Sequence, residues 1–191
     1  MGEEFEVHGI YEDEMERAIE KHEKNDNFAG NIAVVTAILA TLGAMFGYEA
    51  GNTQAVAAMY KNDEAIRTTE ASDKWNFYQA KSSKQNLEEL AIIIPGVDIK
   101  RYQTAIAKHQ VEKEQIKKEA ETLTAQATDF GLKAEKTLHQ HHRWASAMTA
   151  LQIAISLAAI SLLTRRKWLK NAVYGVAGVG MLFAAMAIFN I

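Results

Sequence analysis

Three histidines lie close together in the second half of the chain, at His139, His141 and His142. Histidine is the commonest metal ligand in proteins, so a zinc or haem site is the first chemistry to consider. On a helix, residues two apart point to opposite sides, and only residues three or four apart share a side. His139 and His142, with Glu135 as a further ligand, are therefore the only metal candidates. The alternative is a polar belt at a membrane surface, and on this interpretation we expect no metal and no other cofactor.

The rest of the sequence contains no pattern typical of catalysis. A nucleophile elbow, a phosphate-binding loop, a dinucleotide fingerprint and a zinc-protease motif are all missing. The chain has no cysteine, which excludes thiolate chemistry, and its formal net charge of −3 is too small to favour nucleic acid. We therefore predict a protein that is not an enzyme, with no catalytic residue and no nucleic-acid partner.

Three apolar stretches dominate the sequence, at residues 28–50, 145–164 and 171–191. Each is about 20 residues long, which is enough for a helix to cross the hydrocarbon core of a bilayer. With a single proline in 191 residues, the composition is that of an all-α protein. A soluble protein with buried core helices would require other apolar segments to cover them, and the sequence has none. We predict three transmembrane helices, with the lipid bilayer as their partner.

A basic turn at residues 165–170 joins the second and third stretches. Short loops rich in Arg and Lys stay on the cytoplasmic side of a membrane, and Trp168 suits the headgroup level. This orientation places the N-terminus in the cytoplasm and residues 51–144 on the opposite side of the membrane.

The insert at residues 51–144 is rich in helix formers, and its one strong break is Pro95-Gly96. Proline followed by glycine ends a helix and turns the chain, and Asp98 suits the N-cap of the next helix. Because the break lies near the middle, two arms of roughly 65–70 Å can return antiparallel. We predict a helical hairpin with its tip at 95–97. Nothing breaks the chain between the arms and the apolar stretches, so each helix should run unbroken for about 60 residues or more.

The second arm has apolar residues at alternating spacings of four and three, which is the pattern of a coiled-coil seam. Eight of the eleven positions are apolar or aromatic, and the exceptions are His109, Lys113 and Thr137. The full set is Tyr102, Ile106, His109, Lys113, Ile116, Ala120, Leu123, Ala127, Phe130, Ala134 and Thr137. In the first arm the matching seam near the tip is Phe77, Ala80, Leu87, Ala91 and Ile94.

The first-arm seam is less regular, because Asp63 and Glu70 interrupt it nearer the membrane. An arm whose seam is imperfect is expected to bury part of its surface against another copy of the chain.

The N-terminal segment, residues 1–27, is strongly acidic, and its apolar residues fall on one helical face. An amphipathic helix is therefore plausible, although its charge does not suit anionic lipid. One interpretation is a solvated helix or a partly disordered tail. The other is a docking helix for a basic partner or for a neighbouring copy.

Small residues recur every four positions in two of the apolar stretches. Such faces allow helices to pack closely in lipid, where van der Waals contact replaces the hydrophobic effect. We expect them to serve packing within one chain and between copies. The residues are Gly43, Gly47, Gly51, Ala150, Ala154 and Ala158.

A distinctive run, Ser-Asp-Lys-Trp-Asn-Phe-Tyr-Gln-Ala-Lys, occupies residues 72–81. Together with Lys113 to Ala120 and the end of the second apolar stretch at Ala158 to Arg166, it resembles a bacterial membrane family known as domain of unknown function 4337. The resemblance covers nearly the whole chain. It implies a bacterial membrane setting, and it brings no activity, cofactor or catalytic residue. With the orientation given by the basic turn, we expect a multi-pass protein of the inner membrane with residues 51–144 in the periplasm.

Trp75, Phe77 and Tyr78 in this run are candidate packing residues. One interpretation is a cluster that joins the two arms, and the other is a contact between hairpins of neighbouring copies, since aromatics beside charges are typical interface anchors. We predict a self-associating membrane protein that forms a homo-oligomeric helical scaffold. The alternatives are a channel or transport component, and a membrane sensor or adaptor that recruits a partner.

Overall fold

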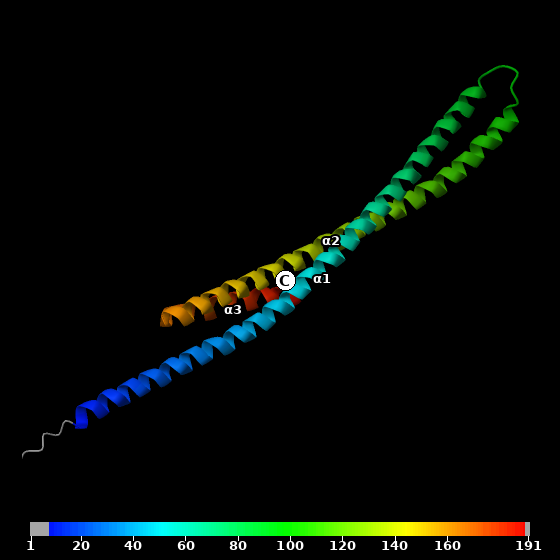
Figure 1. Ribbon diagram of the computed structural model, residues 1–191. Coiled ribbons are helices and arrows are strands. Elements are labelled where there is room, and N and C mark those ends of the chain that lie inside the picture. The colour runs from blue at the N-terminus through cyan, green and yellow to red at the C-terminus, as the bar shows by residue number, and fades with distance from the viewer. Residues whose placement is uncertain (1–7, 190–191) are drawn as a thin grey trace, which may run out of the picture. The chain divides into compact units, whose positions relative to one another are not determined.

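The computed structural model describes residues 8–189, and these residues form three helices with no strand among them (Figure 1). Helix α1 is His8–Ala91, α2 is Ile99–Thr164 and α3 is Lys167–Phe189. The prediction of an all-α protein is confirmed. Helices α1 and α2 contain 84 and 66 residues without interruption, which confirms the prediction of unbroken helices. Residues 1–7 of the acidic segment 1–27 lie outside the described residues. Residues 8–27 form the beginning of α1.

The chain forms two compact units. The three-helix unit contains the residues of α1 up to Asn52, the residues of α2 from Gln140, and α3. The paired arms are residues 53–91 of α1, called the first arm, and residues 99–139 of α2, called the second arm. Each unit is described by itself.

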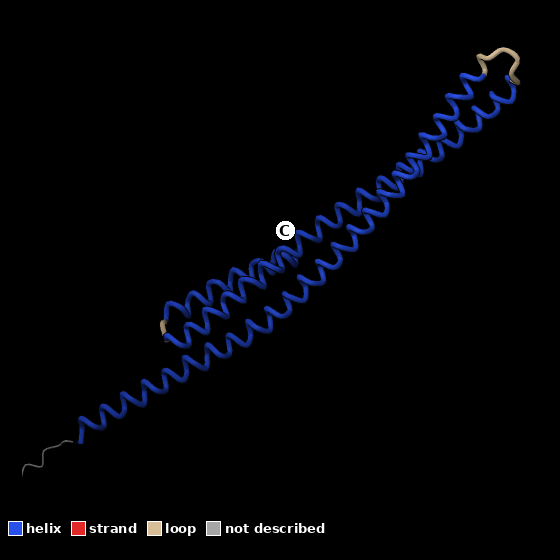
Figure 2. Tube along the Cα trace, turned by 45° about the horizontal axis from the view of Figure 1, so that its top comes forward, coloured by secondary structure: helices blue, strands red, loops and turns tan. Residues whose placement is uncertain are grey.

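The two arms lie side by side and are joined by a short turn (Figure 2). Helix α1 ends at Ala91, before the proline, and Gly96 in the turn has a φ of 88°, which a residue with a side chain rarely adopts. Asp98 Oδ1 accepts a hydrogen bond from the Arg101 backbone N–H at 3.2 Å. This bond satisfies one of the free N–H groups of the first turn of α2, so the predicted N-cap is confirmed.

The three-helix unit is held by a continuous apolar cluster. Ile32 of α1, Leu151 of α2 and Val173 of α3 are each no more than 1% exposed. The rings of Phe46 and Trp144 lie 5.4 Å apart and join α1 to α2. Since every helix contributes fully buried side chains, the unit is a packed bundle of three helical segments.

The connection between α2 and α3 is shorter than the sequence suggested. A turn was expected over residues 165–170, but α3 begins at Lys167, so Arg165 and Arg166 alone separate the helices. Arg165 has a φ of 52°, and its N–H donates to the carbonyl of Ser161 at 2.8 Å. This left-handed residue ends α2 and reverses the chain within a minimal number of residues.

Each of the three helices contains a stretch that is long and apolar enough to cross a membrane. The apolar side chains of these stretches are largely on the outside of the three-helix unit. Leu163 is 84% exposed and Leu182 is 67% exposed.

Candidate functional site

The buried face of the second arm is the one that its heptad pattern predicted. All eleven seam positions from Tyr102 to Thr137 are buried or half-buried, and Ala120 and Ala134 are almost fully enclosed. The two polar exceptions near the tip have partners on the first arm. Lys113 Nζ donates to Gln85 Oε1 at 3.2 Å, and His109 Nε2 lies 3.4 Å from Glu88 Oε1.

The predicted seam of the first arm is wrong. Phe77, Leu87 and Ile94 are 50%, 66% and 58% exposed, and Ala80 is exposed as well, so only Ala91 of the five is half-buried. The first arm instead turns toward the second arm a face that lies one residue further along the chain. The twelve positions of that face are Thr53, Ala57, Tyr60, Glu64, Arg67, Ala71, Lys74, Tyr78, Lys81, Gln85, Glu88 and Ile92, all buried or half-buried.

Charge explains why this face is the inner one. Lys74 Nζ donates to Glu119 Oε2 at 2.6 Å, and Lys81 Nζ donates to Glu112 Oε2 at 2.5 Å, both across the two arms. A pattern search that counts only apolar residues cannot detect a seam whose partners are complementary charges. These ion pairs add to the apolar packing of the seam, while large apolar side chains of the first arm, such as Phe77 and Leu87, remain exposed.

These ion pairs alter the titration of two glutamates. The hydrogen bond from Lys81, with a further one from His109, holds the pKa of Glu112 below its ordinary value. The hydrogen bond from Lys74, with one from Gln115, lowers the pKa of Glu119 in the same way. A carboxylate with a lowered pKa stabilises the fold at pH values above its ordinary pKa of 4.5, and this stabilisation is lost as the pH falls through the lowered value.

Acid is therefore expected to weaken the pairing of the arms. The midpoint of thermal unfolding, followed by circular dichroism in detergent, should fall as the pH decreases from about 5 to about 3. The double variant Glu112→Gln and Glu119→Gln should show a flatter dependence, because its side chains no longer titrate. A double variant whose midpoint falls as steeply as that of the native chain would contradict the role of these two pairs.

The three aromatic candidates have different environments. Trp75 and Tyr78 are half-buried, their rings meet edge to face at 5.7 Å, and Trp75 lines a groove together with Ala127 of the second arm. Lys113 Nζ of the second arm lies 5.3 Å from the centre of the Tyr78 ring, so Tyr78 joins the two arms within one chain, as the first interpretation of the run expects. Phe77 faces another side, where its ring is half exposed and lies 5.5 Å from Lys81 Nζ. Of the three, Phe77 is the one left available to a neighbouring molecule.

The histidine cluster supplies a structural contact that the sequence did not reveal. His139 and His142 are both exposed. His141, which was not a candidate, places its Nδ1 at 2.8 Å from the carbonyl oxygen of Ala50. The neighbouring Gln140 donates from Nε2 to the carbonyl of Ala187 at 3.2 Å. No group of three or more metal-ligating side chains occurs within residues 8–189.

These two bonds tie all three helices together at one end of the three-helix unit. Ala187 lies in the last turn of α3, where carbonyl groups have no partner within the helix. The side chain of Gln140 satisfies one of them. The sequence carries no signal for this role, because it depends on which carbonyl groups the fold brings near Gln140 and His141.

The small residues pack helices within one chain, but not all in the same way. A Cβ added at Gly43 would lie 3.9 Å from Leu151 Cβ, and one at Gly47 would lie 2.9 Å from Met148 Sδ. Gly51 has nothing within 4 Å of such a Cβ. On α2, Ala154 and Ala158 are fully buried and Ala150 is half-buried.

Gly180 lies where α3 packs closely against α2. A Cβ there would lie 3.2 Å from the Ala147 carbonyl oxygen and 3.3 Å from Ala150 Cβ. A side chain at this position would therefore crowd the backbone of α2.

The exposed surface of α1 before the apolar stretch is mainly acidic. Met15 and Ile19, the apolar residues expected on one face, are 67% and 60% exposed. Lys24 pairs with Glu20 at 2.5 Å, and His22 lies 3.3 Å from Asp26. These contacts lie along one helix, so they stabilise the helix itself and leave its apolar face uncovered.

The fold and its surfaces define an all-helical protein with three helices that are long and apolar enough to span a membrane. The chain belongs to the family described as domain of unknown function (DUF4337), whose model matches residues 28–190. The resemblance inferred from the sequence is thereby confirmed. No curated protein and no solved structure matches the chain.

Proposed function

We propose that this chain is a non-enzymatic, self-associating protein of a bacterial inner membrane, and that its copies assemble into a homo-oligomeric helical scaffold. Residues 28–50, 145–164 and 171–191 are its transmembrane helices. Residues 51–144 form an antiparallel coiled-coil hairpin outside the bilayer, with its tip at 95–97.

The apolar exterior of the three-helix unit supports the membrane setting. Val34 and Ile38 of α1, Leu163 of α2 and Leu182 of α3 are all more than half exposed. In water, a contiguous apolar surface of this kind would drive aggregation. In a bilayer, lipid tails cover it without a cost in free energy. The small and fully buried residues lie on the inside, as expected for helices that pack in lipid.

The main support for self-association is the orientation of the first arm within the pair of arms. Lys74 and Lys81 lie on its inner face, while Met59, Ile66 and Leu87 are exposed, over a segment too polar to lie in a bilayer. Exposed apolar surface on such a segment is typical of a protein–protein contact. A second copy, held at the same height by the same membrane helices, is the partner that is always present.

The basic residues around the α2–α3 turn support the proposed orientation. Arg165, Arg166, Lys167 and Lys170 lie within six residues of one another, and short basic connections stay cytoplasmic. On this basis the N-terminal acidic helix is cytoplasmic and the paired arms are periplasmic. The mass of the particle extracted in mild detergent tests the proposed function, since a scaffold requires several chains of 21.2 kDa.

A further inference from the structure

A stripe of outward-facing residues follows the first arm with a repeat of seven. Five of its six members are apolar, all six are exposed, and Asp73 is the single charged one. A repeat of seven keeps residues on one side of a helix that packs along a partner. The members are Met59, Ile66, Asp73, Ala80, Leu87 and Ile94.

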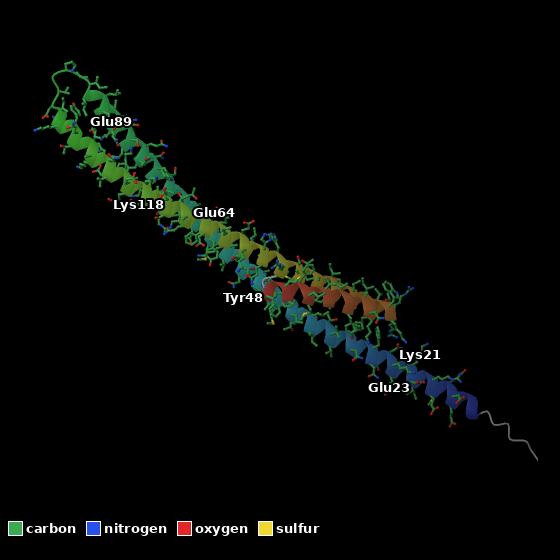
Figure 3. All side chains as sticks on the ribbon, turned by 180° about the vertical axis from the view of Figure 1, so that it is seen from behind. Lys21, Glu23, Tyr48, Glu64, Glu89 and Lys118 are labelled. Atoms are coloured by element: carbon green, nitrogen blue, oxygen red, sulfur yellow. The ribbon has the colours of Figure 1, made fainter. Side chains whose placement is uncertain are left out.

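A second stripe with the same repeat follows the outer side of the second arm. It lies away from the eleven buried seam positions, and all its members are exposed, Val111 to 72% and Leu132 to 62%. It too contains a single charged residue, Lys118, which Figure 3 places on the second arm. The members are Thr104, Val111, Lys118, Ala125 and Leu132.

The contacts within one copy show which residues of the two arms lie at the same height. Lys81 meets Glu112, and Ala80 and Val111 are each one residue from this pair. Tyr60 meets Phe130 with ring centroids 6.3 Å apart, and Met59 and Leu132 lie within two residues of this pair, on the side away from the tip. Two copies with the same orientation in one membrane would therefore bring apolar residues of the two stripes together.

The charges of the two stripes also match. Asp73 and Lys118 are each one residue from the Lys74–Glu119 ion pair, so they too lie at one height. Neither side chain forms an ion pair or a hydrogen bond within residues 8–189. Opposite charges at one level inside an apolar contact fix its register and disfavour other alignments.

We infer that the first arm of one copy packs against the second arm of the next through these two stripes. The inference rests on the proposed self-association and identifies the two surfaces through which the copies pack. The helical part of the first-arm stripe, Met59 to Leu87, is about 40 Å long and about 10 Å wide, because Ile94 lies in the turn after α1. Each pair of copies would bury roughly 800 Å², which is at the small end of protein–protein interfaces. Because two different surfaces meet, the contact is head-to-tail, and its repetition gives a ring or an extended row.

A charge swap tests this contact. Asp73→Lys and Lys118→Asp should each shift most of the protein to smaller species in native mass measurements, because each places like charges at the same height. The double variant carrying both changes should restore the native mass. Glu121→Lys, an exposed charge reversal outside the stripe, is the control and should leave the mass unchanged. Single variants that keep the native mass, or a double variant that fails to restore it, would overturn the inference.

Engineered cysteines provide a second measurement, since the native chain contains none. Two differently tagged chains, one with Ala80→Cys and one with Val111→Cys, should form a disulfide-linked heterodimer when co-expressed and oxidised. The control pair, Ala80→Cys with Leu132→Cys, should not, because Leu132 lies about 30 Å from Val111 along the arm. If no such heterodimer forms while the native mass remains that of several chains, the contact is wrong and self-association stands. A native mass equal to that of one chain would contradict both the contact and the self-association.

Discussion

Replacing Leu151 with alanine is expected to destabilise the three-helix unit by about 2–5 kcal/mol. The side chain is fully buried between α1 and α3, where the space around it is set by Gly43 on one side and Gly180 on the other. Glycines have no side chain that can move into the cavity, so the site cannot collapse easily, and the cost should lie in the upper part of this range. The free energy of unfolding in mixed detergent micelles measures it.

Ile153→Ala is the matched control for this prediction. It removes a side chain of the same size from the same helix, but Ile153 is half exposed and points away from the cluster. We expect a change of about 0.5 kcal/mol or less, as for other surface positions. Equal losses in the two variants would mean that Leu151 does not occupy the centre of the unit.

The second large effect is expected at Gly180. A leucine there would bring its Cβ within 3.0 Å of Leu151 Cδ2 and 3.2 Å of the Ala147 carbonyl oxygen. A side chain can rotate away, but the carbonyl belongs to the α2 backbone, so α3 must separate from α2. We expect Gly180→Leu to destabilise the unit by about 3 kcal/mol, since overpacking of this kind forces backbone shifts.

Gly178→Leu separates this steric effect from the general effect of removing a glycine. Gly178 lies on the same helix, and a Cβ there would have nothing within 4 Å. Because leucine has the higher helix propensity, this variant should be neutral or more stable by up to about 1 kcal/mol. Destabilisation by Gly178→Leu as large as that by Gly180→Leu would contradict the close approach of α2 and α3.

Much of the fold could be predicted from the sequence because its signals are local. Pro95 and Gly96 mark the single break in a long helical segment, and Asp98 marks the start of the next helix. The seam of the second arm was found correctly because most of the residues at its alternating spacings of four and three are apolar and lie on the inner face. In the second arm, the apolar periodicity and the burial of the side chains identify the same face of the helix.

The first arm shows where this reasoning fails. Its apolar residues, among them Phe77 and Leu87, also follow a heptad spacing, but they lie on the outer face. Lys74 and Lys81 lie on the inner face, where each forms an ion pair with a carboxylate from a distant part of the chain. Ion pairs between residues far apart in sequence produce no periodic pattern of apolar residues within one arm. The exposed apolar repeat is the surface that the proposed contact between copies uses.

The candidate site was predicted in part. Gly43, Gly47, Ala154 and Ala158 lie in helix contacts, as their spacing indicated, whereas a Cβ at Gly51 would have nothing within 4 Å. His141 and Gln140 were overlooked, because their roles depend on which carbonyl groups the fold brings near them. Only the packing of α3 distinguishes Gly180 from Gly175 and Gly178.

Self-association is tested most directly by the mass of the native particle in lipid nanodiscs or mild detergent. The measurement should be made over a wide range of dilution, with lipid and detergent counted separately from protein. We predict a protein mass equal to a fixed multiple of 21.2 kDa, greater than two chains, that persists on dilution. A particle that contains one chain under all these conditions would contradict the account.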